Sequence, residues 1–526
     1  MKAGRGQQPR SEAPEASRLP GRRGAVAKRT ARALRRALMR CILVIPVAAG
    51  AMNVAQSTQL PGTNGAGATF YAQGGDNLQA WVNTISAQGG GTLIVPEGTY
   101  PAAVVLASNI TISCVSPKAY LSLPASANAD VVTIPKGASN ISIVNCSISG
   151  NASNQTGTSR GIYAAGRNSA ITLDDVSVDD SHDDAVYFGY ASVTVVNGLA
   201  TGGTYNTNIS ITNSSLTNCG TQCIHIADTR NLWITGNYMY NWGARLPAND
   251  AIGAVGFNSN VHITQNVGIT LSSTYFFMES ASSYFQRVVA GGDISNNFII
   301  TESSAAGAAL GFSGLFFDTT FANNIHLGLS VGANSCSHRA GYEIVGDDDS
   351  ILNNTILNGA IVFAGGDRFT IAKNNIANAC SAGEYGLIAV ASVSVGADTM
   401  TRGIVDGNSI AFTASPANGS AIVLGVYGTS GPFAGVDVVN NSITCPGTNA
   451  TVRGISLRDI GGFGSGNSSV RGNRVSCPGV AGVYLGEATL QNSEITGNDL
   501  RGSGPSAVQV VPGGTNVRVW NNIMDH

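Results

Sequence analysis

The segment Val178–Gly189, VDDSHDDAVYFG, concentrates side chains that transfer protons or hold cations. It places four aspartates and one histidine within six residues and then continues as a short apolar run. Carboxylates and imidazoles act as general acids and bases, and several carboxylate oxygens together bind Ca²⁺. Three interpretations are therefore open: a catalytic centre, a calcium site, or a solvated turn.

The composition indicates which kind of fold carries this segment. Only 11% of the residues are charged, against ~25% in typical soluble domains, and the chain has 66 glycines. Small and β-branched residues suit stacked strands, so we expect an all-β protein. The first 52 residues hold 12 of the 29 basic residues, which leaves an acidic body and no basic face for a nucleic acid.

Residues 1–55 are predicted to be a signal peptide with a basic leader. The apolar run CILVIPVAAGAM follows Arg40 and is about 12 residues long, too short to span a bilayer. Small residues at Ala49–Ala51 offer a cleavage site. We therefore expect a secreted or periplasmic protein without a membrane span.

Export would permit disulfides among the eight cysteines that follow this leader. Their spacing and matching contexts suggest four pairs, although a stack of buried free thiols is the alternative. The candidate pairs are Cys114 with Cys146, Cys219 with Cys223, Cys336 with Cys380, and Cys445 with Cys477.

A short phrase returns along most of the chain: an alternating β run, Asn or Asn-Asn, one residue, then an aliphatic residue. VHITQNVGI, FTIAKNNI and VDVVNNSI are examples. A period of 20–50 residues is typical of solenoids, and two or three short strands per repeat without a helix indicate a β-helix. Asparagine suits the corner because it tolerates left-handed backbone and its amide can hydrogen-bond along the stack. The recurring asparagines are predicted at 213, 237, 266, 297, 324, 354, 375, 408, 441, 473, 498 and 522.

The segment before the repeats, GGDNLQAWVNTISAQGGGTLIVPEGTY, predicts an amphipathic helix capped by Asp76 and closed by Gly89–Gly91. Such a helix would cover the open first coil. Together with the repeats, this opening resembles the pectin-lyase-like superfamily. The resemblance implies a single-stranded right-handed parallel β-helix of about fourteen coils over residues 65–526, with an N-terminal capping helix. That superfamily includes lyases, hydrolases, epimerases and non-enzymatic surface proteins.

One strand of each coil follows the pattern x-small-apolar-x-apolar, as in DAVYF (184–188), QCIHI (222–226) and DAIGA (250–254). Its first and fourth residues are expected to point outward. The first-position column contains Asp184, Gln222 and Asp250, and the fourth-position column contains Tyr187, His225, Gly253 and, further along, Glu343. Since adjacent coils lie about 4.8 Å apart, Asp184 and Asp250 should be about 9–10 Å apart, with His225 between them.

That spacing suits an inverting glycosidase, in which one carboxyl is the acid and the other activates a water. We predict Asp250 and either Asp183 or Asp184 as the acid and base, with His225 tuning them or binding sugar. Aromatic, arginine and acidic residues of the same and following coils are expected to bind the sugar. They are Tyr187, Asp228, Arg230, Trp242, Arg245, Tyr275, Glu279, Arg287, Arg339 and Glu343.

Other chemistries remain open. A polysaccharide lyase would use arginines among those residues, but the acidic body and the three lysines after the leader disfavour it. The segment DSHD, Asp180–Asp183, is similar to the Asp-Pro-His-Asp motif of alginate C5-epimerases, with Ser181 in place of the proline. That resemblance implies that His182 and Asp183 transfer a proton at a sugar C5. The Asn-Thr-Asp, Gly-His-Gly and Arg-Ile-Lys motifs of polygalacturonase-like hydrolases are absent.

Our first expectation is therefore an enzyme that cleaves glycosidic bonds of a polysaccharide or oligosaccharide. Lyase or epimerase chemistry on a uronate polymer is second, and a non-catalytic β-helical surface or carbohydrate-binding protein is third. No cofactor is required and no metal ligands are assigned, but Ca²⁺ remains an alternative. The oligomeric state is left open.

Overall fold

The computed structural model describes residues 67–525 except for sixteen gaps, and the predicted signal peptide lies outside the described residues. The gaps are 197–198, 247–248, 271–275, 281–288, 303–310, 330–339, 379–385, 392–401, 413–418, 426–434, 446–451, 459–465, 479–480, 487–490, 504–505 and 513–514. Gly65–His526 form one compact unit.

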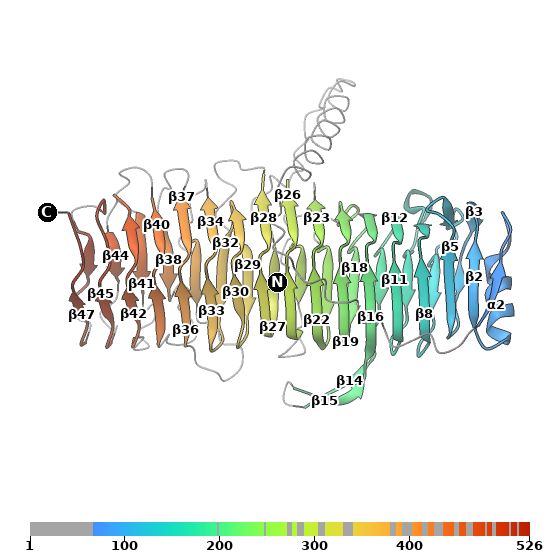
Figure 1. Ribbon diagram of the computed structural model, residues 1–526, viewed down its shortest axis with the longest axis horizontal. Helices are drawn as coiled ribbons and strands as arrows, with labels where there is room; N and C mark the ends of the chain where they lie inside the picture. Colours follow the sequence, from blue (N-terminus) through green and yellow to red (C-terminus); the bar gives the residue numbers. More distant parts are fainter. Residues whose placement is uncertain are drawn as a thin grey trace, which may run out of the picture. The chain divides into compact units, whose positions relative to one another are not determined.

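A typical coil of this unit contributes one strand to each of three faces. Strands β11 (Ser169–Asp174), β12 (Ser177–Ser181) and β13 (Val186–Phe188) are followed by β16 (Asn206–Thr212), β17 (Ser215–Cys219) and β18 (Ile224–Ala227). The first strand pairs in parallel with the fourth, the second with the fifth and the third with the sixth. We call the three faces A, B and C in that order. The chain thus folds as the predicted single-stranded right-handed parallel β-helix (Figure 1).

Face A extends from β1 (Ala68–Tyr71) to β47 (Arg518–Trp520), and face B from β3 (Gly98–Pro101) to β43 (Arg474–Ser476). Face C carries the candidate site. Besides β13 and β18, its strands are β4 (Val104–Val105), β7 (Val132–Ile134), β10 (Ile162–Ala164), β21 (Ile252–Val255), β24 (Met278–Ser280), β27 (Phe312–Ala322), β29 (Ala340–Val345), β32 (Ala360–Ala364), β35 (Ile388–Ala391), β38 (Gly419–Leu424), β41 (Val452–Leu457), β44 (Ala481–Leu485) and β46 (Val508–Val510). An antiparallel hairpin, β14 (Ser192–Val196) and β15 (Leu199–Thr204), projects from the stack (Figure 1).

The core is a set of columns in which one apolar residue from each coil stacks on the next. Alternate residues of each strand point inward, so the period-2 pattern of the sequence becomes continuous apolar columns. Burial of these side chains is the main stabilising contribution. One column on face A contains Leu173, Ile211, Ile234, Ile263, Ile294, Phe321, Ile351, Ile371, Val405, Val438, Val470 and Ile495, all buried.

The recurring asparagines form a buried ladder between faces A and B. For example, the backbone N–H and the side-chain amide of Asn324 both donate to Oδ1 of Asn354, at 2.9 and 3.0 Å. The ladder comprises Asn237, Asn266, Asn297, Asn324, Asn354, Asn374, Asn408, Asn441, Asn473, Asn498 and Asn522.

Two details of the predicted asparagine repeat are corrected. The ladder contains Asn374 rather than Asn375. Asn213 is not a member of the ladder, because in its coil Ser214 takes the ladder position and donates to Asn237, the first ladder asparagine. The left-handed corner is occupied by the residue before each ladder asparagine, such as Asn353 with φ 55° and Asn440 with φ 55°. That division of roles explains why the sequence so often reads Asn-Asn or Gly-Asn at this point.

The first coil is covered by helix α2 (Leu78–Ala87), at the blue end of the stack in Figure 1. Leu78, Val82 and Ile85 are buried against the coil. The helix is capped by Asn77, which accepts from the backbone of Ala80, and not by Asp76 as predicted. Asp76 instead accepts hydrogen bonds from the backbone of Gln73 and from the indole N–H of Trp81.

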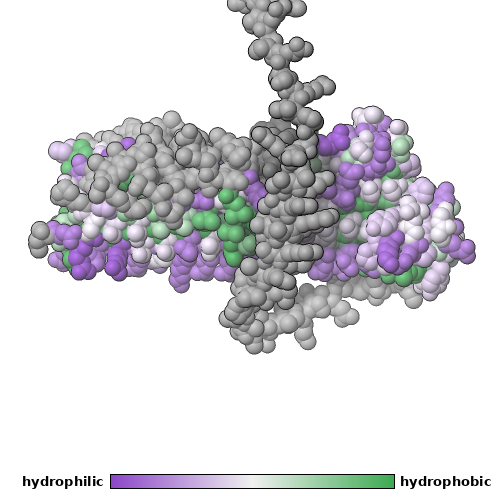
Figure 2. All heavy atoms as spheres, turned by 90° about the horizontal axis from the view of Figure 1, so that it is seen from above, coloured by the Kyte–Doolittle hydropathy of each residue, from purple (hydrophilic) through white to green (hydrophobic). Residues whose placement is uncertain are grey.

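Three of the predicted disulfides are confirmed: Cys114–Cys146, Cys219–Cys223 and Cys445–Cys477. The fourth predicted pair, Cys336–Cys380, lies outside the described residues. Disulfides persist in oxidising compartments, in agreement with an extracellular protein. Among the described residues, no helix is long and apolar enough to cross a membrane. Most of the described surface visible in Figure 2 is hydrophilic or neutral, with smaller hydrophobic areas between.

Candidate functional site

The register of face C brings the predicted outward residues into one column. Tyr187 of β13 pairs with His225 of β18, and His225 pairs with Gly253 of β21. The next members are Glu279 of β24 and Ser313 of β27, and only then Glu343 of β29. The sequence pattern missed β24 and β27 as members of this stack, since MES (278–280) and FSG (312–314) lack the small-apolar phrase.

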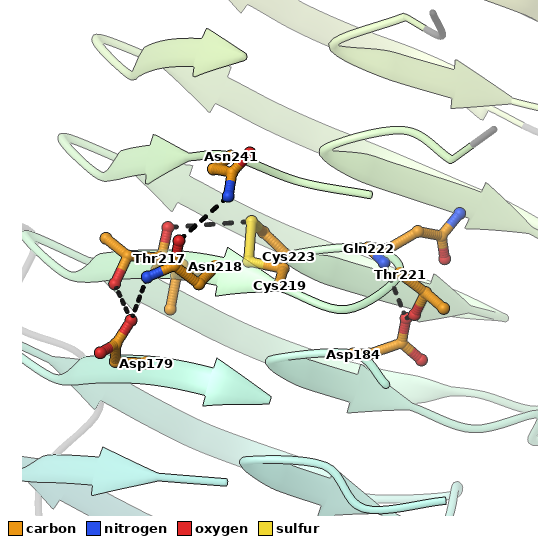
Figure 3. Close-up of a disulfide and its surroundings, with 10 residues drawn as sticks. Asp179, Asp184, Thr217, Asn218, Cys219, Thr221, Gln222, Cys223 and Asn241 are labelled. Atoms are coloured by element: carbon orange, nitrogen blue, oxygen red, sulfur yellow. Dashed lines mark hydrogen bonds between the residues drawn. A yellow bond between two sulfur atoms is a disulfide. The ribbon is translucent and has the colours of Figure 1, made fainter. Parts of the chain in front are cut away.

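The aspartate-rich segment divides between two faces, as Figure 3 shows on the two sides of the Cys219–Cys223 disulfide. Asp179 lies on face B, where it accepts hydrogen bonds from Thr217 Oγ1 (2.6 Å) and Asn218 Nδ2 (2.9 Å) of the next coil. Asp183 and Asp184 precede β13, and Asp184 lies at the edge of face C (Figure 3). Asp179 is therefore structural, and Asp184 takes the first position of the outward pattern with Asp183 directly before it.

His182 lies in the turn between those two parts and is half-buried. Its carbonyl packs against Gly220, where an added Cβ would lie 2.1 Å from the carbonyl oxygen. Asp180 accepts a hydrogen bond from the backbone N–H of Ala152. Within the DSHD segment, Asp180 thus contacts the preceding coil, and Asp183 adjoins the face C cluster through Arg160.

Asp184 is held by the coil that follows it. Its Oδ1 accepts hydrogen bonds from the hydroxyl of Thr221 and from the backbone N–H of Gln222 (3.1 Å). The residue is 6% exposed, and burial raises the pKa of its carboxyl to about 6, against the lowering effect of the Thr221 hydrogen bond. Asp184 is therefore ionised at pH 7 but close to its titration range.

Arg160 is a member of the site that the sequence reasoning missed. Its Nε lies 3.8 Å from Asp183 Oδ2 and 3.9 Å from Asp184 Oδ2, and its guanidinium carbon lies 4.7 and 4.5 Å from the ring centroids of Tyr163 and Tyr187. The segment RGIYA (160–164) has the same pattern as DAVYF (184–188) and stacks on it directly. Extending that alignment by one coil would have found both Arg160 and Tyr163.

His225 forms the centre of the column. Its ring stacks on Tyr187 at 4.3 Å between centroids, and its Nδ1 lies 2.7 Å from Gln222 Oε1. Burial, and secondly the charge of Arg160, lower the pKa of His225 to about 4, so the imidazole is neutral at pH 7. With Nδ1–H donating to Gln222, Nε2 carries the lone pair, and this buried atom has no hydrogen-bond partner among the described residues.

Gly253 provides the space for this arrangement. A Cβ at this position would lie 2.0 Å from Gln222 Nε2. The Gln222 amide therefore occupies the place that a side chain of the next coil would fill. The column thus lacks a side chain of its own between His225 and Glu279, and Gln222 orients the imidazole from that gap.

Asp250 has the opposite protonation state from Asp184. It is 4% exposed, and burial together with the neighbouring Glu279 carboxyl raises its pKa to about 9. Its Oδ1 has no hydrogen-bond partner among the described residues. Burial, and then Glu279, also raise the pKa of Glu343. At pH 7 the site therefore offers an ionised Asp184 and a protonated Asp250, two coils and about 9–10 Å apart.

Four of the predicted sugar-binding residues lie apart from this cluster. Trp242 is fully buried and packs edge-on against Phe277, so it is a core residue and not a stacking platform. Asp228 is buried, and its two oxygens accept from the backbone N–H groups of Phe257 and Ala191. These two predicted roles are therefore corrected to structural ones.

Arg230 lies on face A, with its guanidinium 3.6 Å above the Tyr205 ring. Arg245 is exposed and donates to the carbonyl of Ala152. Tyr275, Arg287 and Arg339 lie outside the described residues. Within the described ranges, no group of three or more His, Cys, Asp or Glu side chains could hold a metal ion.

No family model and no curated protein matches the chain. Its fold is similar to several solved structures. The A-module of the Azotobacter vinelandii mannuronan C-5 epimerase AlgE6 is 15% identical, covering 85% of this chain and 94% of that one, with a TM-score of 0.39. The catalytic domain of a GH87 α-1,3-glucanase solved with nigerose is 16% identical, covering 78% and 68%, with a TM-score of 0.46. The tailspike of E. coli bacteriophage HK620 is 13% identical, covering 84% and 76%, with a TM-score of 0.41. The similarity concerns the fold alone, a right-handed parallel β-helix.

Proposed function

We propose that the protein hydrolyses glycosidic bonds of a polysaccharide or oligosaccharide with inversion at the anomeric carbon. The observation that supports this best is the pair of buried carboxyls in opposite protonation states on one face. Asp250, protonated at neutral pH, is the general acid, and Asp184, ionised, is the general base. Their spacing of about 9–10 Å is close to the ~6.5–9.5 Å that leaves room for a water in inverting enzymes.

In this mechanism Asp250 transfers its proton to the glycosidic oxygen as the bond to the anomeric carbon breaks. Asp184 accepts a proton from a water whose oxygen bonds to that carbon from the opposite side. Hydrogen bonds from Thr221 and the backbone of Gln222 fix one oxygen of Asp184 and leave Oδ2 to meet the water. The Tyr187 ring, stacked on His225, is a flat surface of the kind that packs against sugar rings.

The test is activity on a panel of neutral and acidic polysaccharides, followed by reducing sugar and by absorbance at 235 nm, with and without EDTA. Hydrolysis gives reducing ends without absorbance and, by this proposal, does not need a metal ion. Asp184→Asn and Asp250→Asn should each lower the rate by about 10²–10⁴-fold, while Asp179→Asn on face B should leave it nearly unchanged. The anomer formed first, read by NMR, tests inversion. Full activity in both site variants would rule out this mechanism.

A second candidate is C5-epimerase or lyase chemistry on a uronate, and one observation favours it. His225 is neutral, and its Nε2 has no hydrogen-bond partner among the described residues, as a base that removes the C5 proton would require. Arg160, over the Tyr187 ring that stacks on His225, is a cation that could neutralise the uronate carboxylate. Absorbance at 235 nm, or deuterium at C5 after reaction in D₂O, both lost in His225→Gln, would select this chemistry over hydrolysis.

We also propose that residues 1–55 contain an export signal that is cleaved near Ala51. Three disulfides support an oxidising destination. Mass spectrometry of the protein recovered from outside the cytoplasm would show a new N-terminus close to Ala51. An N-terminus at Met1 in the exported protein would contradict this proposal.

A further inference from the structure

Face C carries a second group of polar side chains towards its C-terminal end. Arg453 lies near the start of β41 and Arg458 directly follows that strand. The Arg453 guanidinium lies 3.6 Å above the ring of Tyr484 in β44. Counted along the face, β41 is six strands beyond β24 of the candidate active site, which corresponds to about 29 Å. This group is therefore separate from the carboxyl cluster.

One donor group of each arginine is without a hydrogen-bond partner among the described residues. The Nε–H groups of both are buried and have no hydrogen-bond partner in the described part of the chain. Both side chains are half-exposed overall, so a solute can reach them. A buried donor without an acceptor costs free energy, and such groups in native proteins usually meet a water, an ion or a ligand.

The charges of the described residues around these arginines are also unbalanced. Neither forms an ion pair with a described carboxylate, whereas other arginines on the described coils do; those are Arg160, Arg368, Arg402, Arg471 and Arg501. Burial, and also the like charge of Arg458, lower the pKa of Arg453. Two cations that repel each other, with no counter-charge among the described residues, favour a bound anion.

A buried acceptor completes the group. Gln509 of β46 is in register with Tyr484, and its Oε1 is buried without a hydrogen-bond partner among the described residues. A ligand that satisfies all three residues must present anionic oxygens to the arginines and a hydroxyl donor to the glutamine. A sugar that bears a carboxylate, sulfate or phosphate group has both.

We propose that Arg453, Arg458 and Gln509 form a binding site for an acidic sugar unit, independent of the reaction at the carboxyl cluster. Its arginines hold the anionic group and Gln509 accepts from a neighbouring hydroxyl. Because the site lies on the same face as the cluster, an acidic polymer that follows the helix axis would reach both.

The test is calorimetric titration at pH 7 in the Asp250→Asn background, which removes turnover by the proposed mechanism. Trigalacturonate is the probe, maltotriose is the neutral control, and inorganic sulfate and phosphate represent a free anion. Arg453→Gln and Arg458→Gln should each weaken trigalacturonate binding about tenfold or more. The matched control Arg471→Gln removes one positive charge from a neighbouring coil, but from an existing pair with Asp437, and should change the Kd less than about twofold. Arg453→Lys keeps the charge but loses the planar guanidinium, so its Kd for trigalacturonate should lie between those of the unsubstituted site and Arg453→Gln.

Binding that weakens with salt and with both site variants, but not with the control, supports the proposal. Gln509→Leu then distinguishes an anionic group carried by a sugar from a free inorganic anion. If this variant weakens trigalacturonate but not sulfate, the site recognises a sugar. Equal binding of trigalacturonate and maltotriose, or equal loss in all arginine variants including the control, overturns the site. Sulfate binding as tight as trigalacturonate, unaffected by Gln509→Leu, overturns its assignment to a sugar.

Discussion

Replacing Asp184 with asparagine should make the protein more stable at neutral pH than the wild type, and the difference should grow with pH. In the folded chain burial raises the pKa of this carboxyl from 3.8 to about 6. Between those values the folded state binds a proton that the unfolded state has released, so stability falls as pH rises through this range. At about 1.4 kcal/mol per pKa unit, the loss amounts to about 3 kcal/mol above pH 6.

Asparagine keeps an oxygen that can accept from Thr221 and from the backbone of Gln222 but cannot ionise. Its amide N–H₂ near Arg160 would change the unfolding free energy by an amount that is the same at every pH. The informative quantity is therefore the change with pH in the difference of unfolding free energy between variant and wild type. Urea unfolding at pH 4, 5, 6 and 7, followed by tryptophan fluorescence, measures it. Relative to the wild type, the unfolding free energy of the variant should rise by about 2.4 kcal/mol from pH 4 to pH 7, because part of the full change lies below pH 4.

Asp367→Asn provides a control with the opposite sign. Although burial opposes it, hydrogen bonds from Arg402 hold the pKa of Asp367 below its ordinary value. That carboxyl stabilises the fold above its unfolded pKa and loses this contribution as pH falls. The unfolding free energy of Asp367→Asn should therefore fall relative to the wild type as pH rises. A difference for Asp184→Asn that is flat between pH 4 and pH 7 would refute the raised pKa, and with it the assignment of Asp184 as a base close to its titration range.

Three further predictions follow from the same contacts. Hydrolytic activity should show a bell-shaped pH profile, limited by Asp184 near pH 6 and by Asp250 near pH 9, in kcat/KM measured on the substrate found in the panel. Thr221→Val removes a hydrogen bond that lowers the pKa of Asp184, so its acidic limb should move to higher pH; an unmoved limb would place the base elsewhere. Asn354→Ala leaves buried ladder groups without partners and should lower the free energy of unfolding in urea by about 1–3 kcal/mol per group. Asn375→Ala, at the exposed position next to the ladder residue Asn374, should lower it little. Equal costs at these two positions would mean that the ladder does not stabilise the fold.

The fold could be predicted from the sequence because its rules are local. Alternating apolar residues define the inward columns, and the same asparagine phrase recurs from coil to coil. Each repeat can therefore be aligned with its neighbours from its own sequence. Cys445 and Cys477 could be paired for this reason, since they follow the same phrase one coil apart. The prediction slipped by one residue at Asn375, because two adjacent asparagines offer two registers and only the backbone corner decides which one enters the ladder.

The candidate site was harder to predict from the sequence than the fold, because the conformation of a turn determines where a residue points after its strand ends. Asp184 and His225 are part of the repeated phrase, and the structure aligns them as the pattern indicated. Trp242 and Asp228 lie in turns, where the spacing of polar and aromatic residues gives no direction. One turn directs the indole into the core, and the other directs the carboxylate onto backbone N–H groups.

The regular stack also explains how a chain with few charges perturbs its carboxyls so strongly. Residues at equivalent positions of successive coils lie about 4.8 Å apart, so each outward side chain is packed between the coils before and after it. Asp184 lies between Arg160 and Gln222 in one such column, and Asp250 follows Gln222. A small residue in the adjacent column, Gly253, then creates a gap that Gln222 fills. Burial on a strand face raises the pKa of both carboxyls; the hydrogen bond from Thr221 then opposes this rise at Asp184, whereas the neighbouring Glu279 carboxyl adds to it at Asp250.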